Sequence, residues 1–138
     1  MIALVVVTED DAFAAAIQTI AGADFSVTCV HVEEAIASAR HDRPDFIAVD
    51  TDSIRDSQSL ISALSLLTLA RIVALAHQAW PASRAAGEWR VAGADAVLPK
   101  PSGRASPTLA GYDGNDYRSW FIAVAGRSNN GAVREAGP

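Results

Sequence analysis

Short apolar runs alternate along the first hundred residues with segments whose apolar positions recur every three or four residues. The runs are rich in β-branched side chains, as expected of strands buried on both faces. They predict five strands, at residues 2–7, 25–30, 46–49, 72–76 and 96–98. The helical spacing between them predicts four helices, after Asp10, at 33–40, at 57–69 and from Pro81 towards Arg90. The helix at 57–69 has an apolar stripe of Leu60, Ile61, Leu64 and Leu67.

This alternation predicts a three-layer α/β/α domain. Strands joined through helices by short connections form a parallel sheet with right-handed crossovers and helices on both faces. We expect the strand order 2-1-3-4-5, which places a ligand crevice at the carboxyl ends of the first and third strands. The same edge receives Glu9, Asp10, Asp50 and Lys100, each of which follows or ends an apolar run.

The last third of the chain is less regular. Residues 102–115 are rich in Gly, Ser, Pro and Asp, which predicts an insertion loop and an altered connection after the fifth strand. Apolar positions after Asp116 recur at helical spacing and predict a displaced last helix, although 120–125 would also suit a buried strand. The chain therefore divides into one domain over 1–127 and a flexible tail over 128–138.

Composition narrows the class of protein. The 138 residues are 50% hydrophobic, which is enough for one core, and the net charge of −5 argues against nucleic-acid binding. Cys29 is the single cysteine and lies within an apolar run, so we expect a buried, inert thiol and a cytoplasmic location. The sequence has no apolar stretch near the ~20 residues of a membrane span and no signal-peptide pattern.

The charged residues at the strand ends suggest phosphoryl chemistry. An aspartate that attacks a phosphoryl group needs its charge screened, and Mg²⁺ does this through one or two carboxylates, substrate oxygens and water. A lysine adds a compact positive charge for the oxygens of the product. The carboxylates of Glu9, Asp10 and Asp50, which converge with Lys100 at this edge, therefore suggest a magnesium and phosphoryl site.

Two motifs, "RPDFIAVD" (residues 43–50) and "AGADAVLPKP" (residues 92–101), stand at the third and fifth strands. With this order and spacing, residues 1–101 resemble the receiver domain of bacterial response regulators in two-component signalling, which has a flavodoxin-like fold. The resemblance makes Asp50 the phosphoacceptor and Lys100 the phosphoryl contact, joined to Pro101 by a cis peptide bond. It makes Glu9, Asp10 and Asp50 a Mg²⁺ site.

The sequence departs from the family at four places. Thr8 stands where the first acidic metal position is expected, and Ala76 replaces a Ser or Thr that contacts the phosphoryl group. Residues 51–57 lack the usual proline and glycine, and Val97 occupies the aromatic switch position. These departures weaken the metal site and the relay to the surface, so the sequence resembles an atypical or pseudo-receiver.

The resemblance implies a phosphorelay or docking domain rather than an enzyme. The implied partners are a sensor histidine kinase or phosphotransfer protein, a downstream protein, and a second copy bound through the fourth helix, fifth strand and last helix. One alternative is a receiver-like module that localises a longer P-loop ATPase-type protein. Another is a small nucleotide-binding α/β domain, which the acidic, glycine-free segment 8–11 disfavours.

Overall fold

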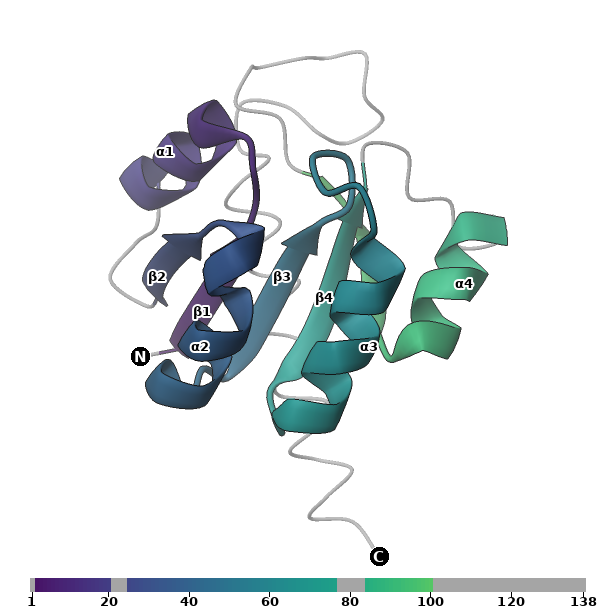
Figure 1. The fold of residues 1–138 in the computed structure, drawn as a ribbon. Coiled ribbons are helices and arrows are strands. Elements are labelled where there is room, and N and C mark those ends of the chain that lie inside the picture. The colour runs from purple at the N-terminus through teal and green to yellow at the C-terminus, as the bar shows by residue number, and fades with distance from the viewer. Residues whose placement is uncertain (1, 21–24, 77–83, 101–138) are drawn as a thin grey trace, which may run out of the picture. The chain divides into compact units, whose positions relative to one another are not determined.

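The computed structural model describes residues 2–20, 25–76 and 84–100. Five parallel strands form one sheet in the order β2-β1-β3-β4-β5, which confirms the predicted flavodoxin-like topology (Figure 1). The strands are β1 (Ile2–Val7), β2 (Phe25–Val30), β3 (Phe46–Asp50), β4 (Arg71–Ala76) and β5 (Ala96–Pro99). The helices of the described ranges are α1 (Asp11–Ile20), α2 (Val32–Asp42), α3 (Ser57–Leu67) and α4 (Arg84–Ala92).

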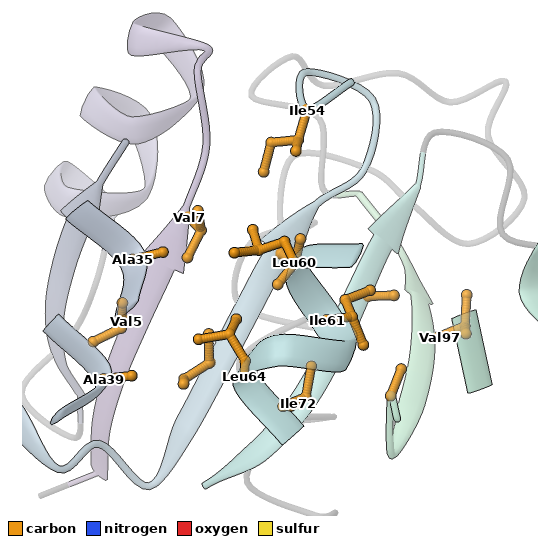
Figure 2. Close-up of a cluster of buried hydrophobic side chains, with 14 residues drawn as sticks. Val5, Val7, Ala35, Ala39, Ile54, Leu60, Ile61, Leu64, Ile72 and Val97 are labelled. Carbon is orange, nitrogen blue, oxygen red and sulfur yellow. The ribbon is translucent and has the colours of Figure 1, made fainter. Parts of the chain in front are cut away.

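Apolar side chains cover both faces of the sheet because neighbouring strand residues point to opposite sides. In Figure 1, α2 and α3 lie over one face, and right-handed crossovers put α1 over the other. The face under α2 and α3 buries a cluster that includes Val5, Val7, Ala35, Ala39, Ile47, Leu60, Ile61, Leu64 and Ile72 (Figure 2). A fully buried side chain such as Ile61 contributes about 1.5–3 kcal/mol.

The third helix is shorter than its apolar pattern predicts. We expected a helix over 57–69 with Leu67 in the buried stripe, but α3 ends at Leu67, and Thr68 has extended backbone angles. Leu67 is 42% exposed and Leu69 is fully exposed, so the prediction that Leu67 is buried is wrong. Leu69 lies within the predicted range but belongs to the connection between α3 and β4.

Cys29 also differs from its expectation. It lies in β2, the edge strand of the sheet, and is half-buried rather than buried. Its thiol donates to the carbonyl oxygen of Ala14 in α1 at 3.6 Å. Burial still raises the pKa of the thiol to about 11, so the thiolate is scarce at neutral pH and the group is unreactive.

Gly93 sets the approach of β5 to the sheet. Its φ of 132° is in a region that side chains rarely adopt, and a Cβ there would lie 2.6 Å from the Cβ of Ser65 in α3. A second link comes from Trp89 of α4, whose indole N–H donates to the hydroxyl of Ser57 at 3.2 Å. The α4–β5 turn is therefore held against α3, and β5 ends where Lys100 follows it.

Several predictions concern segments outside the described residues. These are the insertion loop at 102–115, the displaced last helix, the tail at 128–138 and the cis peptide bond to Pro101. Within the described ranges, no helix is both long and apolar enough to cross a membrane.

Candidate functional site

Strand ends bring three polar side chains to the carboxyl edge of the sheet. Thr8 directly follows β1, Asp50 is the last residue of β3, and Lys100 directly follows β5. Because β4 separates β3 from β5, Lys100 reaches Asp50 across the end of β4. There β4 ends in the small Ala76, whose carbonyl oxygen accepts a hydrogen bond from the backbone N–H of Lys100 at 2.9 Å.

The carboxylate of Asp50 is fully buried and fully engaged. Its Oδ2 lies 3.0 Å from Nζ of Lys100 and accepts a hydrogen bond from the Thr8 hydroxyl at 2.7 Å. Its Oδ1 accepts from the backbone N–H of Asp52 at 3.2 Å. A buried carboxylate persists only when it is paired and hydrogen-bonded, and both oxygens of Asp50 meet that condition.

Lys100 holds a second carboxylate and an aromatic ring. Its side chain is 15% exposed, and Nζ lies 3.4 Å from Oδ2 of Asp10. The same ammonium stands over the ring of Phe13, 4.5 Å from its centroid, within reach of a cation–π interaction. The predicted pairing of Asp50 with Lys100 is therefore present, and Asp10 joins the pair through the ammonium.

Asp10 also begins the first helix. Its Oδ1 accepts the backbone N–H of Phe13 at 3.1 Å, which is the usual bond of an N-cap aspartate. This hydrogen bond, with the charge of Lys100 as a smaller cause, lowers the pKa of Asp10 despite some opposing desolvation. Asp10 thus ties the start of α1 to the ammonium group.

Glu9 is not brought into the charged cluster. Its side chain is exposed, and its contact with the site is made by the backbone N–H, which donates to the hydroxyl of Ser53 at 2.9 Å. The part of the chain that the structure describes contains no group of three or more His, Cys, Asp or Glu residues able to hold a metal ion. Asp10 and Asp50 already share the Lys100 ammonium, so these residues do not form a ready divalent site. The Mg²⁺ site therefore remains a prediction.

Sequence reasoning missed two hydroxyl groups of the site. Thr8 was noted only as a missing acid, but it is 2% exposed and donates directly to Asp50. The hydroxyl of Ser53, in the loop after β3, lies 3.2 Å from that of Thr8 and 3.5 Å from the Asp50 carbonyl oxygen. No motif marks a serine in such a loop. The replacement of an acid by a residue with a hydroxyl donor was the available signal for Thr8.

On the β4 side of Asp50 the surroundings are different. Ala76 is buried and carries no hydroxyl. The hydroxyl of Thr51, which follows Asp50, donates instead to the carbonyl oxygen of Leu75 at 2.7 Å. Thr51 therefore strengthens the join between β3 and β4 and leaves the carboxylate of Asp50 to Thr8, Asp52 and Lys100.

Comparisons with known proteins agree on the fold. No family model and no curated sequence matches the chain. A response regulator from Burkholderia pseudomallei, solved with a phosphorylated aspartic acid, a calcium ion and citrate, is 27% identical with a TM-score of 0.61 over 89% of this chain and 73% of its own.

Two further structures are similar in fold. The first is the complex of CheY6 with the P1 domain of CheA3 from R. sphaeroides. It is 24% identical with a TM-score of 0.64, over 91% of this chain and 97% of the matched chain. The second is a protein from Burkholderia thailandensis assigned to pilus assembly (cpaE). It is 18% identical with a TM-score of 0.63, over 91% of this chain and 99% of its own.

Proposed function

We propose, on the premise that this chain has the receiver-domain fold of response regulators, that it is a signalling domain rather than an enzyme. Asp50 is the phosphoacceptor position and Lys100 the phosphoryl contact. The observation that carries the proposal is the buried ion pair between them, at 3.0 Å, on the carboxyl edge of the sheet. This edge is where parallel α/β sheets place their ligands.

In this proposal the residues of the carboxyl edge supply the nucleophile and a positive charge for the reaction. One carboxylate oxygen of Asp50 attacks the phosphorus of a phosphohistidine, the P–N bond breaks, and the imidazole leaves with the bonding electron pair and takes up a proton. The product is an acyl phosphate on Asp50. Lys100 neutralises the new charge, because its ammonium is a compact donor already at this carboxylate.

The phosphodonor belongs to a sensor histidine kinase or phosphotransfer protein in this proposal, in a cytoplasmic setting. The matched CheY6 structure contains a P1 domain of a CheA protein, and the matched B. pseudomallei structure contains a phosphorylated aspartic acid. Both support the same class of partner here. A downstream protein, or a second copy bound through α4, β5 and the last helix that the sequence predicts, completes the proposal.

Burial of Asp50 sets a condition on this activity. At 0% exposure its oxygens meet a phosphodonor only after the atoms that cover them move aside. We therefore expect slow modification compared with an open carboxylate. Modification at Oδ2 requires that the hydrogen bond from Thr8 and the ion pair with Lys100 rearrange, since both lie on that oxygen.

Amide NMR with beryllofluoride, a mimic of the aspartyl phosphate, tests the proposal. We expect shifts at Asp50, Asp52 and Lys100 in the presence of Mg²⁺, and none of these shifts in Asp50→Asn. Titration with Mg²⁺ alone tests the metal prediction separately, through the amides of Asp10 and Asp50. The absence of any beryllofluoride shift in the wild-type protein would overturn the phosphoacceptor assignment.

A phosphorylation-independent docking module is the second candidate. The complete burial of Asp50 favours it, because a structural ion pair has the same appearance at rest. The match to a protein assigned to pilus assembly indicates that the same fold also occurs under a name outside the response regulators. The present chain would then serve to localise a longer protein. This candidate predicts an unchanged spectrum on adding beryllofluoride and Mg²⁺, which separates it from the first.

A further inference from the structure

Four contacts join Asp50 to the start of α1 in a closed ring. The hydroxyl of Thr8 donates to Oδ2 of Asp50 at 2.7 Å, and the backbone N–H of Asp10 donates to the same hydroxyl at 3.0 Å. The carboxylate of Asp10 lies 3.4 Å from Nζ of Lys100, which returns to Asp50 at 3.0 Å. A change at the Asp50 carboxylate therefore reaches Asp10 by two routes, one through Lys100 and one through Thr8.

A second hydroxyl is attached to this ring. Ser53 accepts the backbone N–H of Glu9 at 2.9 Å, and its hydroxyl lies 3.2 Å from that of Thr8. Together these two side chains, Thr8 and Ser53, are called the hydroxyl pair below. They join the loop after β1 to the loop after β3 by side-chain hydrogen bonds, so the position of one loop depends on the other.

Counting hydrogens shows that two discrete arrangements are open to the hydroxyl pair. Each hydroxyl carries one hydrogen. At rest the hydrogen of Thr8 is given to Asp50, so the Ser53 hydroxyl is the donor towards Thr8 or towards the Asp50 carbonyl oxygen. If Oδ2 of Asp50 stops accepting, the hydrogen of Thr8 can turn to Ser53, and that of Ser53 then goes to the carbonyl. A two-state element of this kind can carry a signal.

The β4 side offers no comparable route among the described residues. Ala76 has no hydroxyl, and the hydroxyl of Thr51 is bonded to the backbone of β4 at Leu75 rather than to the Asp50 carboxylate. The side chains that bind the Asp50 carboxylate are Thr8, after β1, and Lys100, after β5, and both also bind Asp10 at the start of α1.

We propose that the hydroxyl pair is a positioning pair that passes the state of the Asp50 carboxylate to the amino-terminus of α1. The inference rests on the proposed function, in which Asp50 is modified. Modification replaces a carboxylate charge at Oδ2 by a phosphoryl group, and Thr8 changes its acceptor. The backbone N–H groups of Glu9 and Asp10 donate to these two hydroxyls, so both N–H groups respond together. The N-cap hydrogen bond from Phe13 to Asp10 then changes with them.

The test compares beryllofluoride-induced amide shifts in wild-type protein and four variants. Wild-type protein should show shifts at Asp52, next to the modified group, and also at Asp10 and Phe13. Thr8→Val keeps the shape of the side chain without the hydroxyl, and Ser53→Ala removes the second hydroxyl. In both variants we expect the Asp10 and Phe13 shifts to fall below half of their wild-type size, while the Asp52 shift persists.

Thr51→Val is the matched control, because it removes a hydroxyl next to Asp50 that does not bind the carboxylate. It should leave the Asp10 and Phe13 shifts at their wild-type size. Thr8→Ser keeps the hydroxyl and should retain the shifts. It separates loss of the hydroxyl donor from a general disturbance of the structure, and it replaces Thr8→Val in the test if that variant does not fold. Asp10 and Phe13 shifts of wild-type size in both Thr8→Val and Ser53→Ala would overturn the inference.

Failure of the proposed function gives a different result. If beryllofluoride shifts no amide in wild-type protein, the state of Asp50 is changed instead by Asp50→Asn. The amide shifts that this substitution causes at Asp10 and Phe13 are then measured with Thr8 present and again in a Thr8→Val background. Dependence on Thr8 supports the hydroxyl pair even though Asp50 is not a phosphoacceptor, and independence overturns it.

Discussion

Aspartates at the two edges of the sheet are used in opposite ways. At the amino edge, Oδ2 of Asp45 accepts the backbone N–H of Ala3 at 2.8 Å, and Oδ2 of Asp95 accepts that of Ile72 at 2.7 Å. Each of these carboxylates is exposed and binds the main chain of a neighbouring strand. At the carboxyl edge, Asp50 is buried and binds side chains that come from other strand ends.

Each of the two sequence motifs, residues 43–50 and 92–101, has two parts with different roles. Asp45 and Asp50 flank the apolar part of β3, while Asp95 and Lys100 flank β5. The first acid of each motif fixes the start of its strand against a neighbour, and the last charged residue meets its counterpart at the opposite edge. A sequence match to such a motif therefore reports strand placement as well as chemistry, and mutations at the two edges should separate these roles.

The largest effect is expected from Lys100→Met. This change keeps an unbranched side chain over Phe13 but leaves the fully buried Asp50 carboxylate without its positive partner. Breaking a buried pair on one side costs about 3–5 kcal/mol. Urea unfolding at neutral pH measures the loss as a fall in the free energy of unfolding.

The double variant Asp50→Asn with Lys100→Met is the control for that experiment. Because it removes both charges, most of the stability should return. The double variant should therefore lose less stability than the sum of the losses of the two single variants. A loss for Lys100→Met below about 1 kcal/mol, the range of exposed ion pairs, would mean that water reaches Asp50 in solution.

Asp95→Ala should destabilise the protein by less than Lys100→Met does, and it should leave the site around Asp50 unchanged. It removes the acceptor of the Ile72 backbone N–H, a charge-assisted hydrogen bond worth about 1.5–3 kcal/mol. Asp45→Ala is the parallel change at β3, with a smaller loss because its hydrogen bond to Ala3 is exposed. Unfolding gives the stability of each variant.

The informative readout for these two variants is the beryllofluoride response. If the amino edge has a purely structural role, the shifts at Asp50 and Lys100 keep their wild-type size in both variants. A loss of those shifts in a variant that is still folded at the temperature of measurement would break the division between the edges.

Much of the fold follows from the sequence because its signals are local. Buried β-branched runs and short connections are sufficient to order five parallel strands, and the parallel pairing of β1 with both β2 and β3 confirms that order. The error at Leu67 arose because apolar spacing does not report where a helix ends. The exposed Leu69 falls within the predicted range 57–69 but lies in the connection to β4.

The site was predictable only as far as strand ends define it. Asp50 and Lys100 end apolar runs, so topology brings them to one edge. The role of Ser53 depends on how the loop after β3 folds back to meet the N–H of Glu9, and no periodicity describes that loop. For Glu9 the sequence gives the position but not the direction of the side chain, which is exposed.

A hydroxyl added at the end of β4 should have a smaller effect on stability than the changes above. It should have a clear effect on the amide shifts that beryllofluoride induces. Ala76→Ser places a donor at the end of the strand next to Asp50, at a cost of about 1 kcal/mol if the hydroxyl lacks a partner at rest. With beryllofluoride bound, the new hydroxyl gains an acceptor, so shifts should extend to the amides of β4. Ala74→Ser in the same strand is the control, and equal spreading in both variants would contradict this account.

The smallest effect is expected at Asp10, which lies at the carboxyl edge and also caps the start of α1. The pKa of Asp10 is lowered in the folded protein, first by the N-cap bond from Phe13 and then by Lys100. A carboxyl with a lowered folded pKa stabilises the protein above its unfolded pKa of about 3.9, and this contribution is lost as the pH falls through the folded value. Because the side chain is 42% exposed, we expect no more than about 0.5–1 kcal/mol at neutral pH.

Asp10→Asn isolates the charge, because asparagine is also a good N-cap. The difference in unfolding free energy between wild-type protein and Asp10→Asn should therefore be present at pH 7 and shrink towards zero below about pH 4. Urea unfolding at several pH values between 2 and 7 measures it. If the difference is the same at every pH, the cap geometry rather than the charge of Asp10 stabilises α1, and Asp10 then resembles Asp45 and Asp95 more than Asp50.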